Sequence, residues 1–134
     1  IQREQAAAAS DAFYRQIGNA RIIAAQRGIQ VRLDYSATGL LNTAGWTDSC
    51  GDAVWAVSIA TPDGPKPRQA LACLSSADFN KRYHDTTMAL DSGPTSITYL
   101  PTGIASNATA QMKFTQGSKT SNIFILPGGT ARVQ

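Results

Sequence analysis

Few side chains in this 134-residue chain could carry out chemistry, and their spacing matches no familiar catalytic set. His84 is the single histidine, and a hydrolytic set could be imagined from it with Asp85 and either Ser75 or Ser76. A loop histidine that faces solvent is the better interpretation of His84. The chain also has no glycine-rich phosphate loop, no Gly-x-Ser-x-Gly elbow and no two-histidine helix motif. We therefore expect no enzyme activity, no cofactor and no metal site.

The two cysteines, Cys50 and Cys73, are too few for a structural zinc site, which needs four ligands. We interpret them as one disulfide, which implies folding in an oxidising compartment. Closing this loop would stabilise the fold by roughly 3 kcal/mol in the chain-entropy model. Two unpaired buried thiols in a reducing compartment are the alternative.

The charge balance permits, but does not require, contact with an anionic partner. Twelve Lys and Arg residues against nine Asp and Glu give a net charge of +3, far from that of a dedicated DNA-binding domain. Lys113 and Arg132 fall at outward positions of two expected late strands, and Lys119 lies on the turn between them. These three residues form a candidate DNA-contact patch, which would contact phosphates without reading bases. Ordinary solvating charges are the alternative.

The elements that must position these side chains begin with a helix. Small or apolar residues recur every three or four positions between Gln2 and Arg27, which predicts a helix of about 25 residues. Arg27 and Gly28 form a typical helix end. We expect the first turns to project from the domain, because they carry few large apolar side chains. The residues of this stripe are Ala6, Ala9, Phe13, Ile17, Ala20 and Ala24.

After Gly28 the apolar period changes to two, which is typical of strands with one buried face. Glycine- and proline-rich turns separate the runs, so we expect antiparallel pairing. Residues 60–96 carry four of the six prolines and are predicted to be a long irregular segment tied down by the disulfide. The predicted strands lie at 29–35, 53–59, 97–99, 110–114, 123–126 and 131–133.

Length and composition favour one α+β domain over residues 1–134, with the long N-terminal helix packed on antiparallel sheet. The chain is 43% hydrophobic, which is enough for one core and too little chain for two domains. No uninterrupted apolar run reaches the ~18 residues that span a membrane.

Three local patterns resemble one family. The segment from Ile17 to Leu33 reads apolar-x-x-Ala-Arg-x-x-Ala-x-x-Arg-x-x-x-Val-x-Leu, which resembles the signature of the FimT/FimU/GspH group of minor pilins and pseudopilins. The stretch from Ser96 to Gly103 is similar to that group's late strand and Pro-x-Gly turn. The stretch from Ile123 to Val133 resembles its final hairpin. Together they cover the helix, the first strand and the last forty residues.

The resemblance implies a type IV pilin-like fold and a particular use of the helix. An upstream hydrophobic helical segment, cut by a prepilin peptidase, would anchor the subunit in the inner membrane and later pack in the filament core. Ala6, Ala9 and Phe13 would then pack against the helices of neighbouring subunits. The residues that would dock the helix on the sheet are Ile17, Ala20 and Ala24.

The resemblance also implies a structural role in a bacterial filament. The chain would be a minor pilin that primes a type IV pilus or sits near its tip, serving adhesion, twitching motility and DNA uptake. Its partners would be other minor pilins and the major pilin. It would be located in the inner membrane and periplasm before assembly and in the extracellular pilus afterwards, and a disulfide suits periplasmic folding.

Two alternatives remain within the group. One is a GspH-type minor pseudopilin of type II secretion. The other is a FimT-like minor pilin that binds DNA for natural transformation. Some FimT-like members carry a Gly-Arg-x-Arg pattern near the C-terminal hairpin, and here that place reads Gly129-Thr-Ala-Arg132, which lacks one arginine.

Overall fold

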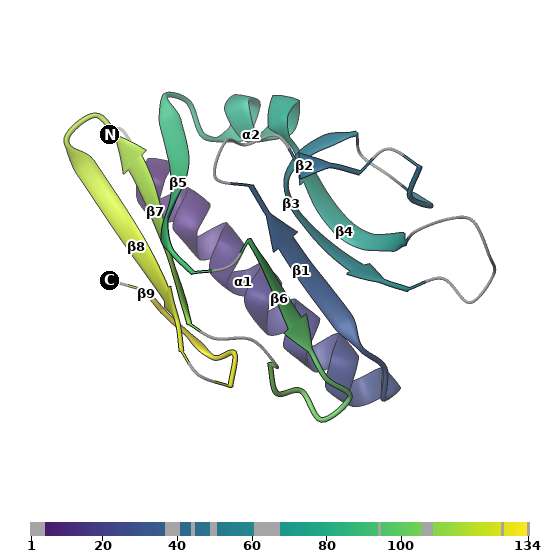
Figure 1. Ribbon diagram of the computed structural model, residues 1–134. Helices are drawn as coiled ribbons and strands as arrows, with labels where there is room; N and C mark the ends of the chain where they lie inside the picture. The colour runs from purple at the N-terminus through teal and green to yellow at the C-terminus, as the bar shows by residue number, and fades with distance from the viewer. Residues whose placement is uncertain are drawn as a thin grey trace.

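A 23-residue helix, α1 (Gln5–Arg27), runs diagonally behind two antiparallel β-sheets and is drawn in purple in Figure 1. The computed structural model describes residues 5–36, 41–43, 45–48, 51–60, 68–93, 95–105, 109–126 and 128–133. The helix ends at Arg27, where the sequence places its end. Gly28 adopts a φ of +63°, a left-handed conformation that favours glycine, and the amide of Ile29 donates to the carbonyl of Ala24 at 3.2 Å.

The first sheet, sheet A, has five strands in the order β2-β3-β1-β6, with β4 also paired to β3. The four pairings between its described strands are antiparallel, and the register places Leu33 opposite both Val57 and Ile97. Because side chains alternate along a strand, Val31, Leu33 and Tyr35 share one buried face. The strands are β1 (Val31–Tyr35), β2 (Leu41–Asn42), β3 (Asp52–Ile59), β4 (Gln69–Ser75) and β6 (Ser96–Tyr99).

The second sheet, sheet B, has four strands in the order β5-β7-β8-β9, and lies on the left of Figure 1. Its inward residues alternate with outward polar ones, and the buried side chains include Met112, Phe114, Ile123 and Ile125. The strands are β5 (Thr86–Ser92), β7 (Ala110–Gln116), β8 (Lys119–Ile125) and β9 (Ala131–Val133).

One aromatic side chain of α1 joins the two sheets. The ring of Phe13 is fully buried, with its centroid 5.4 Å from the rings of Tyr35 and Trp55 in sheet A and 6.0 Å from that of Phe114 in sheet B. Trp55 in turn makes an edge-to-face contact with Phe79 at 6.0 Å. Such pairs stabilise a core beyond the burial of their area. The centre of the core therefore lies between the helix and both sheets.

The prediction that residues 60–96 form an irregular segment is wrong over the part that the structure describes. Residues 68–93 contain β4, a short helix α2 (Ser76–Arg82) and β5. β4 pairs with β3 through two register shifts, so its burial does not alternate and the period of two is lost. α2 is too short to show a helical period, and Ser75 caps it by accepting a hydrogen bond from the amide of Asp78 at 3.1 Å.

Candidate assembly surface on the long helix

The inward face of α1 is a continuous stripe of small residues that is buried by the chain's own sheets. Alanines on this face let the helix lie close to the strands, and only Phe13 and Ile17 contribute large side chains. The seven buried positions are Ala6, Ala9, Ser10, Phe13, Ile17, Ala20 and Ala24.

The assignment of Ala6, Ala9 and Phe13 to contacts with neighbouring subunits is therefore wrong. All three have no exposed surface in the isolated chain, so no neighbour can reach them. They continue the same face as Ile17, Ala20 and Ala24, because steps of three and four residues return to one side of a helix. The buried positions therefore form one face, by which α1 packs on the sheets.

The first turn of α1 does not project from the domain, contrary to the expectation from its sequence. The amide of Gln5 donates to Oε1 of Gln116 at 2.9 Å. The hydroxyls of Ser10 and Ser121 share a buried hydrogen bond of 2.7 Å. These two contacts, added to the apolar packing, tie the start of the helix to the β7–β8 hairpin. Sequence reasoning missed them because polar residues on a helix do not reveal distant partners.

The opposite side of α1 carries a second periodic set of residues, which we call the outer stripe. An added Cβ atom at Gly18 would meet nothing within 4 Å, so this position faces open space. Tyr14 is 42% exposed and Ile22 is 55% exposed. The outer stripe consists of Ala7, Asp11, Tyr14, Gly18, Ile22 and Ala25.

Near its C-terminal end the outer stripe borders a shallow groove of about 300 Å³ between α1 and the β6–β7 connection. Ile104, which is 55% exposed, forms part of the far wall. Internal hydrogen bonds hold that connection, including Leu100 amide to Ile104 carbonyl at 2.9 Å. The lining residues are Gly18, Arg21, Ile22, Ala25, Thr102, Gly103 and Ile104.

The outer stripe was not predicted from the sequence, where the buried stripe is the more regular of the two. A signal was present, since the small and apolar residues at 7, 14, 18, 22 and 25 recur at steps of seven, four, four and three, which return to one side of a helix. What the sequence does not reveal is which of two such stripes the sheets cover. The helix is therefore two-sided, with one stripe buried and one available to another molecule.

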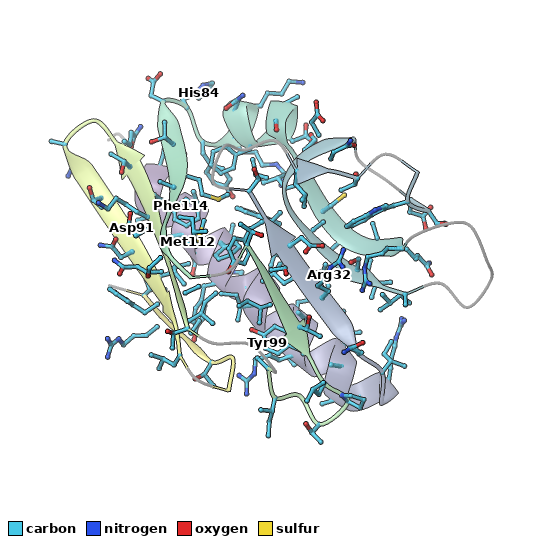
Figure 2. All side chains as sticks on the ribbon, viewed as in Figure 1. Arg32, His84, Asp91, Tyr99, Met112 and Phe114 are labelled. Atoms are coloured by element: carbon cyan, nitrogen blue, oxygen red, sulfur yellow. The ribbon has the colours of Figure 1, made fainter. Side chains whose placement is uncertain are left out.

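Strand register places Lys113 and Arg132 on the same outward face of sheet B, two strands apart, and places Lys119 at the start of β8. Lys113 lies on β7 and its Nζ is 3.7 Å from Oδ2 of Asp91 on β5, which is labelled in Figure 2. Arg132 lies on β9 and stacks over the ring of Phe124 at 5.5 Å. Lys119 begins β8, about 17 Å along the strand from Phe124 at ~3.4 Å per residue. DNA contact stays a prediction, and salt-sensitive shifts of duplex DNA that are lost on Lys119→Ala with Arg132→Ala would demonstrate it.

Ser75 and His84, two of the residues from which a hydrolytic set could be imagined, flank the short helix α2. The hydroxyl of Ser75 is engaged as the cap of α2, and His84 is exposed on the turn before β5, near the top of Figure 2. Across the described ranges, no three His, Cys, Asp or Glu side chains gather where they could hold a metal ion. Cys73 lies on β4 and is not a free thiol. Cys50 lies outside the described residues, so the pairing of these two cysteines stays a prediction.

A polar cluster on sheet A was also not predicted from the sequence. Nε of Arg32, labelled in Figure 2, donates to Oδ2 of Asp34 at 2.8 Å, and its guanidinium lies 5.8 Å from the ring of Trp46. Arg68 donates to both the hydroxyl and the carbonyl of Ser58, at 2.7 and 3.1 Å. Burial raises the pKa of Asp34, and the two arginines partly oppose that rise. The cluster holds the loop of Trp46 against the sheet, which is a structural role.

A long N-terminal helix behind two antiparallel sheets is the type IV pilin-like fold. The crystal structure of the type IV minor pilin FimU from Pseudomonas aeruginosa aligns with a TM-score of 0.64 and 11% identity, covering 96% of this chain and 87% of that one. The minor pseudopilin EpsH from the Type 2 Secretion System of Vibrio cholerae aligns with a TM-score of 0.59 and 10% identity, covering 97% and 96%. At these identities the likeness shows the fold alone.

The sequence identifies the family. The model of the family described as "Type II transport protein GspH" matches residues 9–129. This chain belongs to the GspH family, within the FimT/FimU/GspH group of type IV pilin-like minor pilins. The resemblance inferred from the three sequence patterns is thereby confirmed. No curated protein sequence matches the chain. Among the described residues, no helix is both long and apolar enough to cross a bilayer.

Proposed function

We propose that this chain is a minor pilin that helps to prime a type IV pilus and is incorporated near its tip. The observation that carries the proposal is the two-sided helix. The residues of its inward face are buried by the chain's own sheets, whereas Tyr14 and Ile22 of the outer stripe are exposed to solvent. A contiguous exposed apolar patch is typical of an interaction surface, and Tyr14, Gly18 and Ile22 follow one another on one side of the helix.

In the proposed assembly, the outer stripe packs against the helix of a neighbouring subunit. Gly18 and Ala25 allow a close approach of two helices, and Ile22 fills the space between their backbones. Fully burying an isoleucine side chain stabilises a contact by about 1.5–3 kcal/mol, so burying the exposed half of Ile22 contributes about 1 kcal/mol. An upstream apolar segment would hold the subunit in the inner membrane before assembly. Other minor pilins and the major pilin would supply the neighbouring helices.

The proposal is tested by adding a charge to the outer stripe of the full-length protein in its native host. Ile22→Arg should leave the fold intact, with a change in unfolding free energy within about 0.5 kcal/mol, because the side chain is exposed. It should reduce the surface pili that can be sheared from a strain whose own copy is deleted. Gln26→Arg is the matched control, since Gln26 is exposed on the same helix but does not line the groove. Normal piliation with Ile22→Arg would refute the assembly role of the stripe.

A GspH-type pseudopilin of type II secretion is the second candidate, and the description of the matching family model favours it. Both roles would use the outer stripe in the same way, so the geometry of α1 does not separate them. The same deletion strain separates them by phenotype. Loss of secreted type II substrates with normal pili would support the pseudopilin and contradict the pilus role.

A further inference from the structure

Arg21 is the charged side chain in the groove beside the outer stripe. Arg21 lines the groove, and its Nε atom is buried without a hydrogen-bond acceptor among the described residues. The described ion pairs engage Arg15, Arg32 and Lys113, and Arg21 is in none of them. Because Arg21 lines the groove, a molecule bound there can supply an acceptor to the other N–H groups of its guanidinium.

Arg21 also acts electrostatically on a neighbouring tyrosine, Tyr99. Burial raises the pKa of Tyr99, and the positive charge of Arg21 opposes that rise. The hydroxyl of Tyr99 already donates to the carbonyl of Gly129 at 2.8 Å. Tyr99 stays neutral at physiological pH, so it does not form an ion pair with Arg21.

The groove walls define the rest of the ligand. Ile22 and Ala25 on α1 and Ile104 on the β6–β7 connection are apolar, and Gly18 leaves room for the backbone of another chain. A guanidinium pairs best with a carboxylate, because two parallel N–H donors match its two oxygens. The complementary surface is therefore an apolar segment that carries one Asp or Glu side chain.

We propose that Arg21 binds the carboxylate of an Asp or Glu side chain on a neighbouring pilin-class subunit, whose apolar segment occupies the groove. The inference rests on the proposed assembly function and adds to it the chemistry that selects the neighbour. The groove is continuous with the outer stripe through Gly18, Ile22 and Ala25, so one segment can cover both. An apolar segment without the acid would bury Arg21 unpaired, which is unfavourable and so provides specificity.

The test places a photo-activated cross-linking residue at Ile104 of the full-length protein in assembling cells and sequences the cross-linked peptide. We expect an apolar peptide of a different pilin-class subunit, with Asp or Glu within about one helical turn of the cross-link. Arg21→Glu should lower the cross-link yield about tenfold or more, since truncating or reversing one partner of a buried charge pair weakens binding by at least that much. Arg21→Lys should retain part of the yield. Changing the partner's acid to Arg should restore the yield of Arg21→Glu, which a merely structural role of Arg21 cannot explain.

Several results would overturn the inference while leaving the proposed function in place. These are a cross-linked peptide that lacks an acidic residue, a cross-link to a second copy of this chain, and a yield that Arg21→Glu does not change. If Arg21→Glu fails to fold, the neutral Arg21→Gln replaces it, with the same expected loss. A second cross-linker at Tyr14 reports on assembly itself. If neither position yields a subunit cross-link, the proposed function fails as well.

Discussion

Replacing Phe13 with alanine is the strongest single test of how the helix is used. The side chain has no exposed surface, and its ring contacts three aromatic rings in both sheets at 5.4 to 6.0 Å. Removing a buried phenylalanine costs about 3–5 kcal/mol, which is the lost burial plus the cavity that remains. The two sheets cannot both move inward to fill this cavity, so we expect about 4 kcal/mol. That is a large share of the roughly 5–15 kcal/mol that stabilises a typical domain.

Urea unfolding followed by circular dichroism measures this loss. With a slope of about 2 kcal/mol/M, the midpoint of Phe13→Ala should fall by about 2 M. Phe13→Leu should cost less than about 2 kcal/mol, because it keeps most of the volume. Tyr14→Ala is the matched control, since Tyr14 follows on the same helix but is 42% exposed, and it should cost less than about 1 kcal/mol.

The reasoning would be refuted if Phe13→Ala and Tyr14→Ala cost the same and less than about 1 kcal/mol. Phe13 would then lie outside the core of the isolated domain. The interpretation from sequence, in which Phe13 packs against a neighbouring subunit, would be restored in that case.

Three further perturbations test other parts of the fold. Gly129→Ala should lower the free energy of unfolding by at least about 2 kcal/mol in a thermal or urea melt, because φ is +92° and the new Cβ would collide with the ring of Tyr99. Gly117→Ala is the control: φ is +60° and the new Cβ would meet nothing within 4 Å, so the loss should be only about 1 kcal/mol. Burial raises the pKa of Tyr99 from 10.0 to about 12. Between those values the unfolded chain loses a proton that the folded chain keeps, so stability should fall as the pH rises, by about 1.4 kcal/mol per unit, and urea melts of Tyr99→Phe from pH 9 to 12 should show a shallower fall. Reduction should lower stability by roughly 3 kcal/mol in the wild type and not in Cys73→Ser, and a non-reduced digest should contain a Cys50–Cys73 peptide; unchanged stability on reduction would disprove the disulfide.

The sequence predicted those parts of the fold that a local period determines. The end of α1 at Arg27 and the strands around Leu33, Val57 and Ile123 follow from spacing and turn residues. β4 could not be predicted in this way, because its two register shifts against β3 interrupt the alternation. α2 has only seven residues, fewer than the several turns over which a helical period becomes visible.

The sequence led us to expect a contact surface on the long helix, but the residues named for it, Ala6, Ala9 and Phe13, are buried. A stripe on the helix is visible in the sequence, whereas the side that meets the sheets depends on partners more than a hundred positions away, as for Ser10 and Ser121. The missing partner of Arg21 is equally invisible in sequence, because any arginine has solvent as its default partner. Tertiary contacts alone reveal that its Nε is enclosed without an acceptor.

The alanines on the inner face of α1 have a consequence for how such a protein can evolve. Because alanine side chains are small, α1 lies very close to the strands. A larger side chain at one of these positions must therefore push the helix away from the sheets. Displacing α1 would shift Tyr14 and Ile22 relative to the two sheets without altering either residue. Mutations hidden in the interior could thus spoil or repair polymerisation, and suppressors of a surface defect should be sought at Ala20 and Ala24 as well as on a neighbouring chain.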